Sequence, residues 1–318
     1  MENFNCALHR FAVFLAASTL VLIFVGGLVT STDSGLAVPD WPLSYGQLFP
    51  RMVGGVLYEH GHRMVAATVG LLAVILAVWL WRRDPRKWVR VLGGLALLAV
   101  IGQGVLGGIT VLFLLPVAVS VSHAALAQIF FCLTVALATF TSRAWHEAGA
   151  QLEDRGAPSL RLLSRLTTAV VYLQILIGAL MRHTASGMAI PDFPLSYGRL
   201  IPPYFTRPIL INFAHRVGAL VVAVMVIWLA TQVLRRHAME PLLRRPAWAL
   251  LIALAVQIFL GAETVWSGRG VIFTTLHVAA GAFTLATSLY LTLMTHRVIR
   301  PQPAARPAVA AQPGVAME

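Results

Sequence analysis

The sequence predicts an all-α polytopic membrane protein whose eight transmembrane helices form two tandem, pseudo-twofold-related four-helix bundles. Three observations support this fold class: the composition, eight long apolar runs and an internal repeat. Of the 318 residues, 58% are hydrophobic and 11% are charged, whereas about a quarter of a soluble domain is charged. A net charge of +12 would suggest nucleic acid in a soluble protein. Here the basic residues cluster between apolar runs, so we expect contact with membrane lipid and no nucleic-acid partner.

Eight apolar runs are long enough to cross a bilayer, which takes roughly 20 residues each. They occupy 11–31, 56–81, 90–113, 117–141, 162–183, 208–234, 247–266 and 271–296. The basic residues gather after every second run, as in Arg82, Arg83, Arg86, Lys87 and Arg90, and again near 143–165, 235–245 and 297–306. Because basic loops stay on the cytoplasmic side, we expect both termini in the cytoplasm and the loops after the odd-numbered runs outside.

An internal repeat divides the chain into two similar halves. The stretch 34–50 recurs at 186–202 with twelve of its seventeen residues identical, and later matches keep an offset of 152 to 154. Each half has an even number of spans, so both copies are expected to insert the same way up, as in transporters with parallel repeats. Asp40 and Asp192 occupy equivalent places in these repeated loops, which we expect to cap the bundles, and nearby arginines are their candidate partners.

The repeat also sets the predicted domain boundaries. The N-terminal bundle covers 1–142 and the C-terminal bundle 162–300, joined by a cytoplasmic linker at 143–161. The remaining stretch, 301–318, is rich in Pro and Ala and is expected to be disordered.

Four histidines have repeat partners: His62 with His215, and His123 with His277. Each lies about six residues into a helix that starts outside, roughly 9 Å below the outer surface. Bundles build cofactor sites from side chains on facing helices, and histidine is a common haem-iron ligand. We therefore expect one haem per half, near the outer face. The alternative is that each histidine is a hydrogen-bonded packing residue.

The other histidines are not expected to bind iron. His60 is only two residues from His62, so its side chain points about 200° away around the helix. The rest lie in loops or at helix ends without a repeat partner and are expected to be solvated: His9, His146, His183, His237 and His296.

Charged residues beside the paired histidines differ between the halves. Arg63 and Arg216 follow His62 and His215. They are candidates to bind the carboxylates of a haem in their own half, or to reach lipid headgroups. Glu59 lies one turn before His62 on the same face, where the second copy has Asn212. A carboxyl group next to a haem can act as an acid or base, so this half is expected to perform chemistry. Alternatively, Glu59 only interacts with the helix dipole.

Together these motifs closely resemble the haem A synthases over almost the whole chain. The resemblance rests on Gly26-Gly27-Leu28-Val29, Ser34-Gly35-Leu36, Asp40-Trp41-Pro42, Glu59-His60-Gly61-His62-Arg63 and the histidines at 123, 215 and 277. It implies an enzyme of the bacterial cytoplasmic (inner) membrane that oxidises a methyl group of haem O to a formyl group by successive hydroxylations. The product would be haem A for cytochrome c oxidase. Haem O synthase and assembly factors of the oxidase are candidate partners, and an oligomer is compatible with the sequence.

The resemblance also assigns roles to the residues. His62 and His123 would lie around the substrate haem O, His215 and His277 would ligate a haem B cofactor, and Glu59 would be the catalytic carboxylate. Many bacterial members carry two cysteines in the first outer loop, but residues 32–55 contain none. The chain thus resembles the cysteine-free, mitochondrial/proteobacterial-like subgroup.

Two other functions share the paired histidines. A non-enzymatic dihaem b-type cytochrome would move electrons from a quinol and would not need a carboxylate in one half alone. A haem carrier would bind haem reversibly without turnover. The sequence also leaves open whether His62 and His123 both ligate iron during turnover, since two axial ligands would block oxygen activation there.

Overall fold

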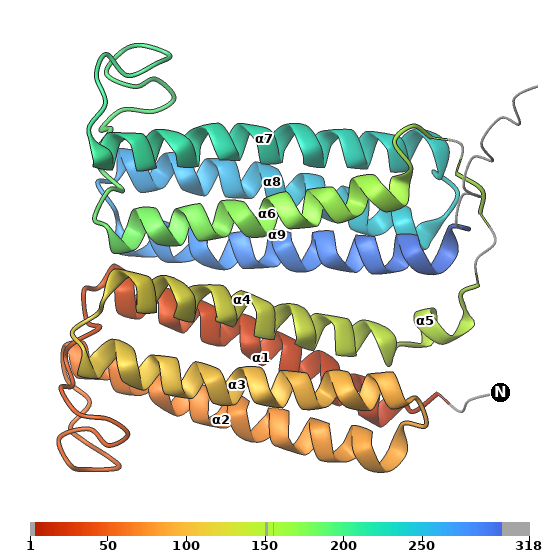
Figure 1. Ribbon diagram of the computed structural model, residues 1–318, viewed down its shortest axis with the longest axis horizontal. Helices are drawn as coiled ribbons and strands as arrows, with labels where there is room; N and C mark the ends of the chain where they lie inside the picture. The colour runs from red at the N-terminus through yellow and green to blue at the C-terminus, as the bar shows by residue number, and fades with distance from the viewer. Residues whose placement is uncertain (1–3, 150–151, 155, 301–318) are drawn as a thin grey trace, which may run out of the picture.

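The computed structural model describes residues 4–149, 152–154 and 156–300 (Figure 1). The helices are α1 (Cys6–Ser31), α2 (Gly55–Arg83), α3 (Lys87–Leu112), α4 (Val117–Phe140), α5 (Arg143–Glu147), α6 (Leu160–His183), α7 (Arg207–Arg236), α8 (Pro241–Trp266) and α9 (Val271–Val298). Eight of these, all but α5, are long and apolar enough to cross a membrane. The expected all-α polytopic class is confirmed.

The helices form two four-helix bundles that pack against each other. In one bundle α1 to α4 each contact the next helix and α4 returns to α1, and α6 to α9 close in the same way. The bundles meet where α1 and α4 of the first contact α9, and α4 also contacts α6 of the second (Figure 1). The arrangement follows the repeat, because each copy supplies one complete ring of helices.

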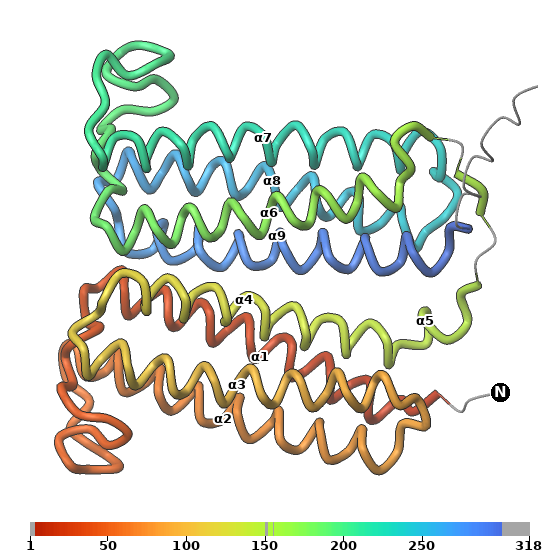
Figure 2. The backbone as a smooth tube through the Cα atoms, viewed as in Figure 1, coloured from red at the N-terminus to blue at the C-terminus, as the bar shows by residue number. Residues whose placement is uncertain are grey.

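Both long loops project from the same end of the molecule. The loop between α1 and α2 and the loop between α6 and α7 lie together at one end, whereas the start of α1 and the end of α9 lie at the other (Figure 2). The two halves therefore run in the same direction, as an even number of helices per repeat requires.

Several helix ends differ from the expected runs by a few residues, and two of the departures from the sequence expectation depend on capping. Helix α8 begins at Pro241 rather than near 247, because proline suits the first turn and the Glu240 carboxylate accepts a bond from Leu242 N at 3.1 Å. An apolar-run criterion misses this turn, which contains Arg244 and Arg245. The expected linker also contains α5, whose first turn is capped by Ser142.

The apolar core of each bundle lies at the end away from the long loops. In the first bundle it includes Leu15, Leu76, Leu80, Phe130 and Leu137. In the second it includes Leu163, Val226, Leu229, Leu250 and Leu291. These well-packed ends leave the loop-proximal halves of the bundles for the four paired histidines.

Candidate functional site

Each of the four paired histidines packs against a glycine on the preceding helix. A Cβ added to the glycine would lie 3.1 Å from Cε1 for Gly26 and His62, 3.4 Å for Gly107 and His123, 3.0 Å for Gly178 and His215, and 3.0 Å for Gly261 and His277. Such contacts are tighter than ordinary van der Waals packing, so a larger residue would displace the ring. The same glycine–histidine contact therefore positions all four imidazoles.

The C-terminal half brings its two imidazoles together across the bundle in an edge-to-face arrangement. The ring centroids of His215 and His277 are 6.5 Å apart, with the planes at 71°. A metal–imidazole bond of about 2 Å places the centroids of two rings on opposite sides of one metal about 6 Å apart. The Gln174 amide lies 3.1 Å from His215 Nδ1, and His277 Nδ1 lies 3.2 Å from the Gln257 carbonyl. Both rings thus have a partner that fixes their orientation, which is typical of metal-ligating histidines.

The N-terminal half brings His62 and His123 near each other but orients their rings less completely. The two imidazoles interact electrostatically. Within the described part of the chain, Nδ1 of each ring is buried and has no hydrogen bond of normal geometry. The Gln103 backbone still acts on the His123 ring, as the Gln257 backbone acts on His277. His62 differs most from its counterpart, because Leu22 stands where the other half has Gln174. Since buried polar atoms are normally paired, these two nitrogens fit a site whose remaining partner is a bound group.

Glu59 and Arg63 form a buried ion pair that also holds the outer loop. Glu59 is 4% exposed, and its Oε1 accepts a bond from Arg63 at 2.6 Å while Oε2 accepts one from Val38 N at 2.8 Å. Arg63 NH1 donates to the carbonyl oxygens of Asp40 and Leu43, each at 2.8 Å. The carboxylate is thus fixed by the loop and by Arg63.

The second copy builds the same anchor with an amide. Asn212 Oδ1 accepts a bond from Arg216 Nε at 2.9 Å, and Asn212 Nδ2 donates to the Ser186 and Gly187 carbonyls at 3.0 and 2.9 Å. Arg216 also donates to the Leu195 carbonyl at 2.7 Å. Both arginines therefore bind loop carbonyls, which the sequence did not predict as their partners.

The repeated loops fold alike around an aspartate. Asp40 accepts bonds from Tyr45 N at 2.7 Å and Gly46 N at 2.8 Å, and Asp192 accepts the equivalent bonds from Tyr197 N and Gly198 N, both at 2.7 Å. The bonds from Gly46 and from Gly198 are the main reason that the pKa of each carboxyl lies below its usual value. The arginines expected to pair with Asp40 and Asp192 act on them only electrostatically. The hydrogen bonds to both carboxylates come from backbone N–H groups.

Trp41 anchors the first loop on the bundle. A Cβ on Gly108 of α3 would lie 2.7 Å from Trp41 Cδ2, so the indole rests directly on the helix backbone. In the second loop Phe193 takes the equivalent place, and its carbonyl accepts a bond from Trp266 Nε1 at 3.2 Å. The expected capping loops are thus fixed to their bundles.

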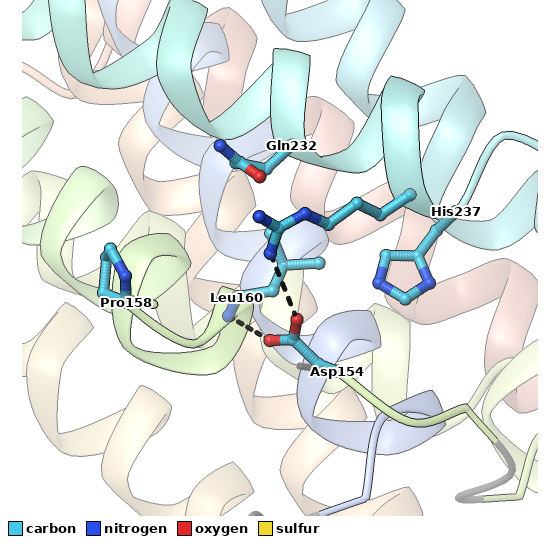
Figure 3. A pocket seen from close by; sticks show the side chains of 6 residues that line it. Asp154, Pro158, Leu160, Gln232 and His237 are labelled. Atoms are coloured by element: carbon cyan, nitrogen blue, oxygen red, sulfur yellow. Dashed lines mark hydrogen bonds and ion pairs between the residues drawn. The ribbon is translucent and has the colours of Figure 1, made fainter. Parts of the chain in front are cut away.

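Among the other histidines, His60 points away from the His62 site as predicted, but the five expected to be solvated are not: His9, His146, His183 and His296 are partly buried, and His237 is buried. His60 Nδ1 bonds to Ser44 Oγ at 2.8 Å, away from the His62 site. The expectation that His237 is solvated is wrong, since it is only 9% exposed. It lines a pocket at the end opposite the long loops, where Asp154 accepts a bond from Leu160 N at 2.5 Å and faces Arg236 NH1 at 3.8 Å (Figure 3). Asp154 thus connects the start of α6 to the end of α7.

The fold and the paired histidines define a polytopic membrane protein with a candidate haem site in each half, and sequence comparison gives its family. The family model described as "Cytochrome oxidase assembly protein" (COX15-CtaA) matches residues 9–55 and 54–289. The chain belongs to this family.

Individual relatives share most of their length with this chain. A protein of Symbiobacterium thermophilum is 35% identical over 79% of this chain and 84% of its own, and one of Halalkalibacterium halodurans is 27% identical over 92% and 98%. A third, from Geobacillus kaustophilus, is 28% identical over 90% and 92%. All three are named "Heme A synthase".

Proposed function

We propose that this protein is a haem A synthase, an oxidoreductase that converts a methyl substituent of haem O into a formyl group. The first of two hydroxylations gives an alcohol and the second a geminal diol, which loses water to form the aldehyde. Each hydroxylation replaces a C–H bond of the methyl carbon with a C–O bond and removes two electrons, which an external oxidant accepts; that oxidant or water supplies the oxygen atom. The family membership and the shared name of the relatives support this reaction. Haem O synthase would supply the substrate, and cytochrome c oxidase would take the product.

We assign the two halves different roles because their histidines differ in hydrogen bonding. This difference is the observation on which the assignment depends. Gln174 and Gln257 orient His215 and His277, as suits ligands of a resident haem B, and haem B supplies one-electron transfer when bound. His62 has no such glutamine, because Leu22 stands in place of Gln174, and its Nδ1 is unpaired in the described residues, as suits a site that a substrate enters and leaves. Haem O is therefore assigned to the N-terminal half.

The residue types around each pair fit a haem better than a protein-bound metal. In the described ranges no group of three or more His, Cys, Asp and Glu side chains is arranged to hold a metal ion. A porphyrin supplies four nitrogens to its iron, so a pair of protein ligands is sufficient. The glycine contacts hold the four imidazoles in place without any of the loop residues.

Glu59 is proposed as the functional carboxylate of the substrate half. Its charge is kept in a buried position by Arg63 and Val38 N. Asn212 shows that an amide is enough to anchor the equivalent loop. Loop anchoring therefore does not account for a carboxylate at this position, and the ionisable group is available to hold or transfer a proton during the hydroxylations.

The function is tested by pigment analysis. The chain is produced together with haem O synthase in a bacterium that lacks its own haem A synthase, and membrane haems are extracted and separated. We expect a formyl-bearing haem that is absent without the chain. A dihaem cytochrome or a haem carrier would yield only unmodified haems, and that result would refute the proposal.

The same assay tests Glu59 through Glu59→Gln, which keeps the side-chain shape and removes the charge. General acid–base groups typically contribute about 10²- to 10⁴-fold, so haem A should fall at least tenfold. The matched control is Glu147→Gln, because Glu147 pairs with Arg143 at the same i,i+4 spacing but is exposed. Normal haem A from Glu59→Gln would leave Glu59 only its anchoring role.

The orientation and the subgroup are also part of the proposal. The arginine-rich ends of the helices are assigned to the cytoplasm of a bacterial inner membrane, with both histidine pairs toward the outer face. The loop at 32–55 has no cysteine, which is the only feature that supports the cysteine-free, mitochondrial/proteobacterial-like subgroup. The relatives named above are instead from Gram-positive bacteria.

A further inference from the structure

The arginines expected to bind haem carboxylates already use their donors elsewhere. All three guanidinium nitrogens of Arg216 donate to loop or side-chain oxygens, at 2.7 to 3.0 Å. Arg63 binds Glu59 and the first loop. A haem in the C-terminal half would bring two carboxylates with it, so a cation with unused donors near His277 is a candidate to bind one of them.

Arg182 is such a cation, and it lies at the junction of the two halves. It is the penultimate residue of α6, and its NH2 donates to Ser31 Oγ at 2.9 Å and to the Gly27 carbonyl at 3.3 Å, both in α1. Within the described ranges its Nε and NH1 take part in no recorded hydrogen bond. Arg182 also acts electrostatically on the His277 ring. Its repeat counterpart is Thr30, so the N-terminal half has no equivalent charge.

The charges around Arg182 do not neutralise it. The acidic side chain that acts on Arg182 is Asp33, which is 83% exposed and already faces Arg269 NH2 at 3.6 Å. Arg269 in turn repels Arg182. This group of three side chains has one excess positive charge at the loop-proximal end. A partly buried guanidinium with only uncharged hydrogen-bond partners is costly next to the membrane, unless an anion joins it.

The position of Arg182 is fixed before any ligand binds. Ser31 Oγ accepts a second bond from Thr275 Oγ1 at 3.0 Å, so one hydroxyl joins α1, α6 and α9. Thr275 is two residues from His277. A Cβ on Gly27 would lie 3.3 Å from Thr275 Cγ2, while the neighbouring Gly26 contacts His62. Helix α1 therefore touches both histidine sites, and a preorganised cation costs little further ordering on binding.

We propose that Arg182 binds a carboxylate side chain of the haem held by His215 and His277. This inference rests on the proposed function, because it requires haem in the C-terminal half. A guanidinium binds a carboxylate through two parallel hydrogen bonds, and Nε with NH1 or NH2 offers such a pair. Arg182 would also link that haem to the N-terminal half through Ser31.

The test compares haem B with its dimethyl ester, in which both carboxylates are neutral. Full-length protein produced without haem is titrated with each compound, and binding is followed by visible absorbance. A hydrogen bond to a charged group is worth about 1.5–3 kcal/mol, so esterification should weaken binding to the wild type by at least tenfold. In Arg182→Gln most of this difference should disappear, and Arg182→Lys should keep part of it.

The control is Arg199→Gln, at an exposed loop position where the first half has Gln47. Esterification should weaken its haem binding by the same factor as in the wild type. Equal sensitivity of Arg182→Gln and wild type to esterification would overturn the inference. If Arg182→Gln does not fold, a wild type that binds both compounds equally well overturns it too. Failure of the wild type to bind haem at all would instead refute the proposed function.

Discussion

At the scale of single residues, the absence of a Cβ atom at four glycines sets the position of the four histidine rings. Each imidazole packs against a glycine of the preceding helix, and this contact occurs twice in each copy of the repeat. Periodicity and the repeat predict which histidines matter, because both are properties of the sequence. They do not predict the glycine partners, since the two residues of each pair lie on different helices and meet only after packing.

The contact between Gly261 and His277 gives a prediction about haem binding. Gly261→Ala places a methyl group 3.0 Å from His277 Cε1, and overpacking of this kind typically costs about 1–3 kcal/mol. We expect at least a fivefold loss of bound haem B, measured as haem per protein after purification. Gly94→Ala is the matched control, because no atom lies within 4 Å of its added Cβ. Equal haem content in both variants would contradict the role of this contact.

The hydrogen-bond partners of the arginines next to the histidines could not be predicted from the sequence. Arg63 and Arg216 were expected to meet haem carboxylates or lipid headgroups, and both bind loop carbonyls about 20 residues earlier in the chain. A guanidinium can bind any nearby oxygen, so sequence position alone does not choose among them. Arg182 drew no attention in the sequence because its partners lie in α1, roughly 150 residues away.

At the scale of elements, the two repeated loops are the most regular non-helical parts of the molecule. Each closes around an aspartate that accepts two backbone N–H groups, and in each a tyrosine hydroxyl donates to the backbone, Tyr45 to the Ala37 carbonyl and Tyr197 to the Ala189 carbonyl. The sequence predicted capping loops from the repeat. It did not predict their internal bonds, which depend on the turn conformation.

The aspartates make the loop structure dependent on pH. Bonds from Gly46 and Tyr45 keep the pKa of Asp40 below its usual value, which is about 3.9 in an unfolded chain. The carboxylate therefore stabilises the loop fully above that value, and the stabilisation is lost as pH falls from about 4 through the lower folded pKa. Amide hydrogen exchange of the 40–50 peptide, corrected for intrinsic rates, should show constant protection from pH 7 to 5 and a decline below 4.

Each aspartate can be tested against the other. Asp40→Asn should remove protection of the 40–50 peptide at every pH and leave the 192–202 peptide unchanged, and Asp192→Asn should do the reverse. Protection in Asp40→Asn that still falls with the wild-type pH profile would show that another group titrates in this loop.

At the scale of the whole molecule, two parallel four-helix units pack side by side with their loops at one end. Both histidine pairs lie toward the end of the molecule that carries the long loops, because the two units run in the same direction. Helix α1 contacts His62 through Gly26 and, through Gly27, Thr275, which is two residues from His277.

The orientation of the molecule is testable by cysteine labelling. Cysteines are introduced as Arg199→Cys and Arg83→Cys in a background with Cys6→Ser and Cys132→Ser. Position 199 lies in the long loop between α6 and α7, and position 83 is the last residue of α2, at the other end of the molecule. Because basic ends remain in the cytoplasm, a membrane-impermeant maleimide should label position 199 in intact spheroplasts and position 83 only after lysis. The reverse pattern would invert the topology.

The sequence by itself determined the eight spans, the tandem repeat and the pairing of four histidines, because hydrophobicity and spacing are local properties of the chain. Only the tertiary structure decided which atoms complete each site. It showed that Gln174 orients His215 whereas His62 has no such partner, that Arg63 and Arg216 hold loops, and that Arg182 joins the two halves. These outcomes depend on donors and acceptors from distant segments, whose meeting is set by helix packing.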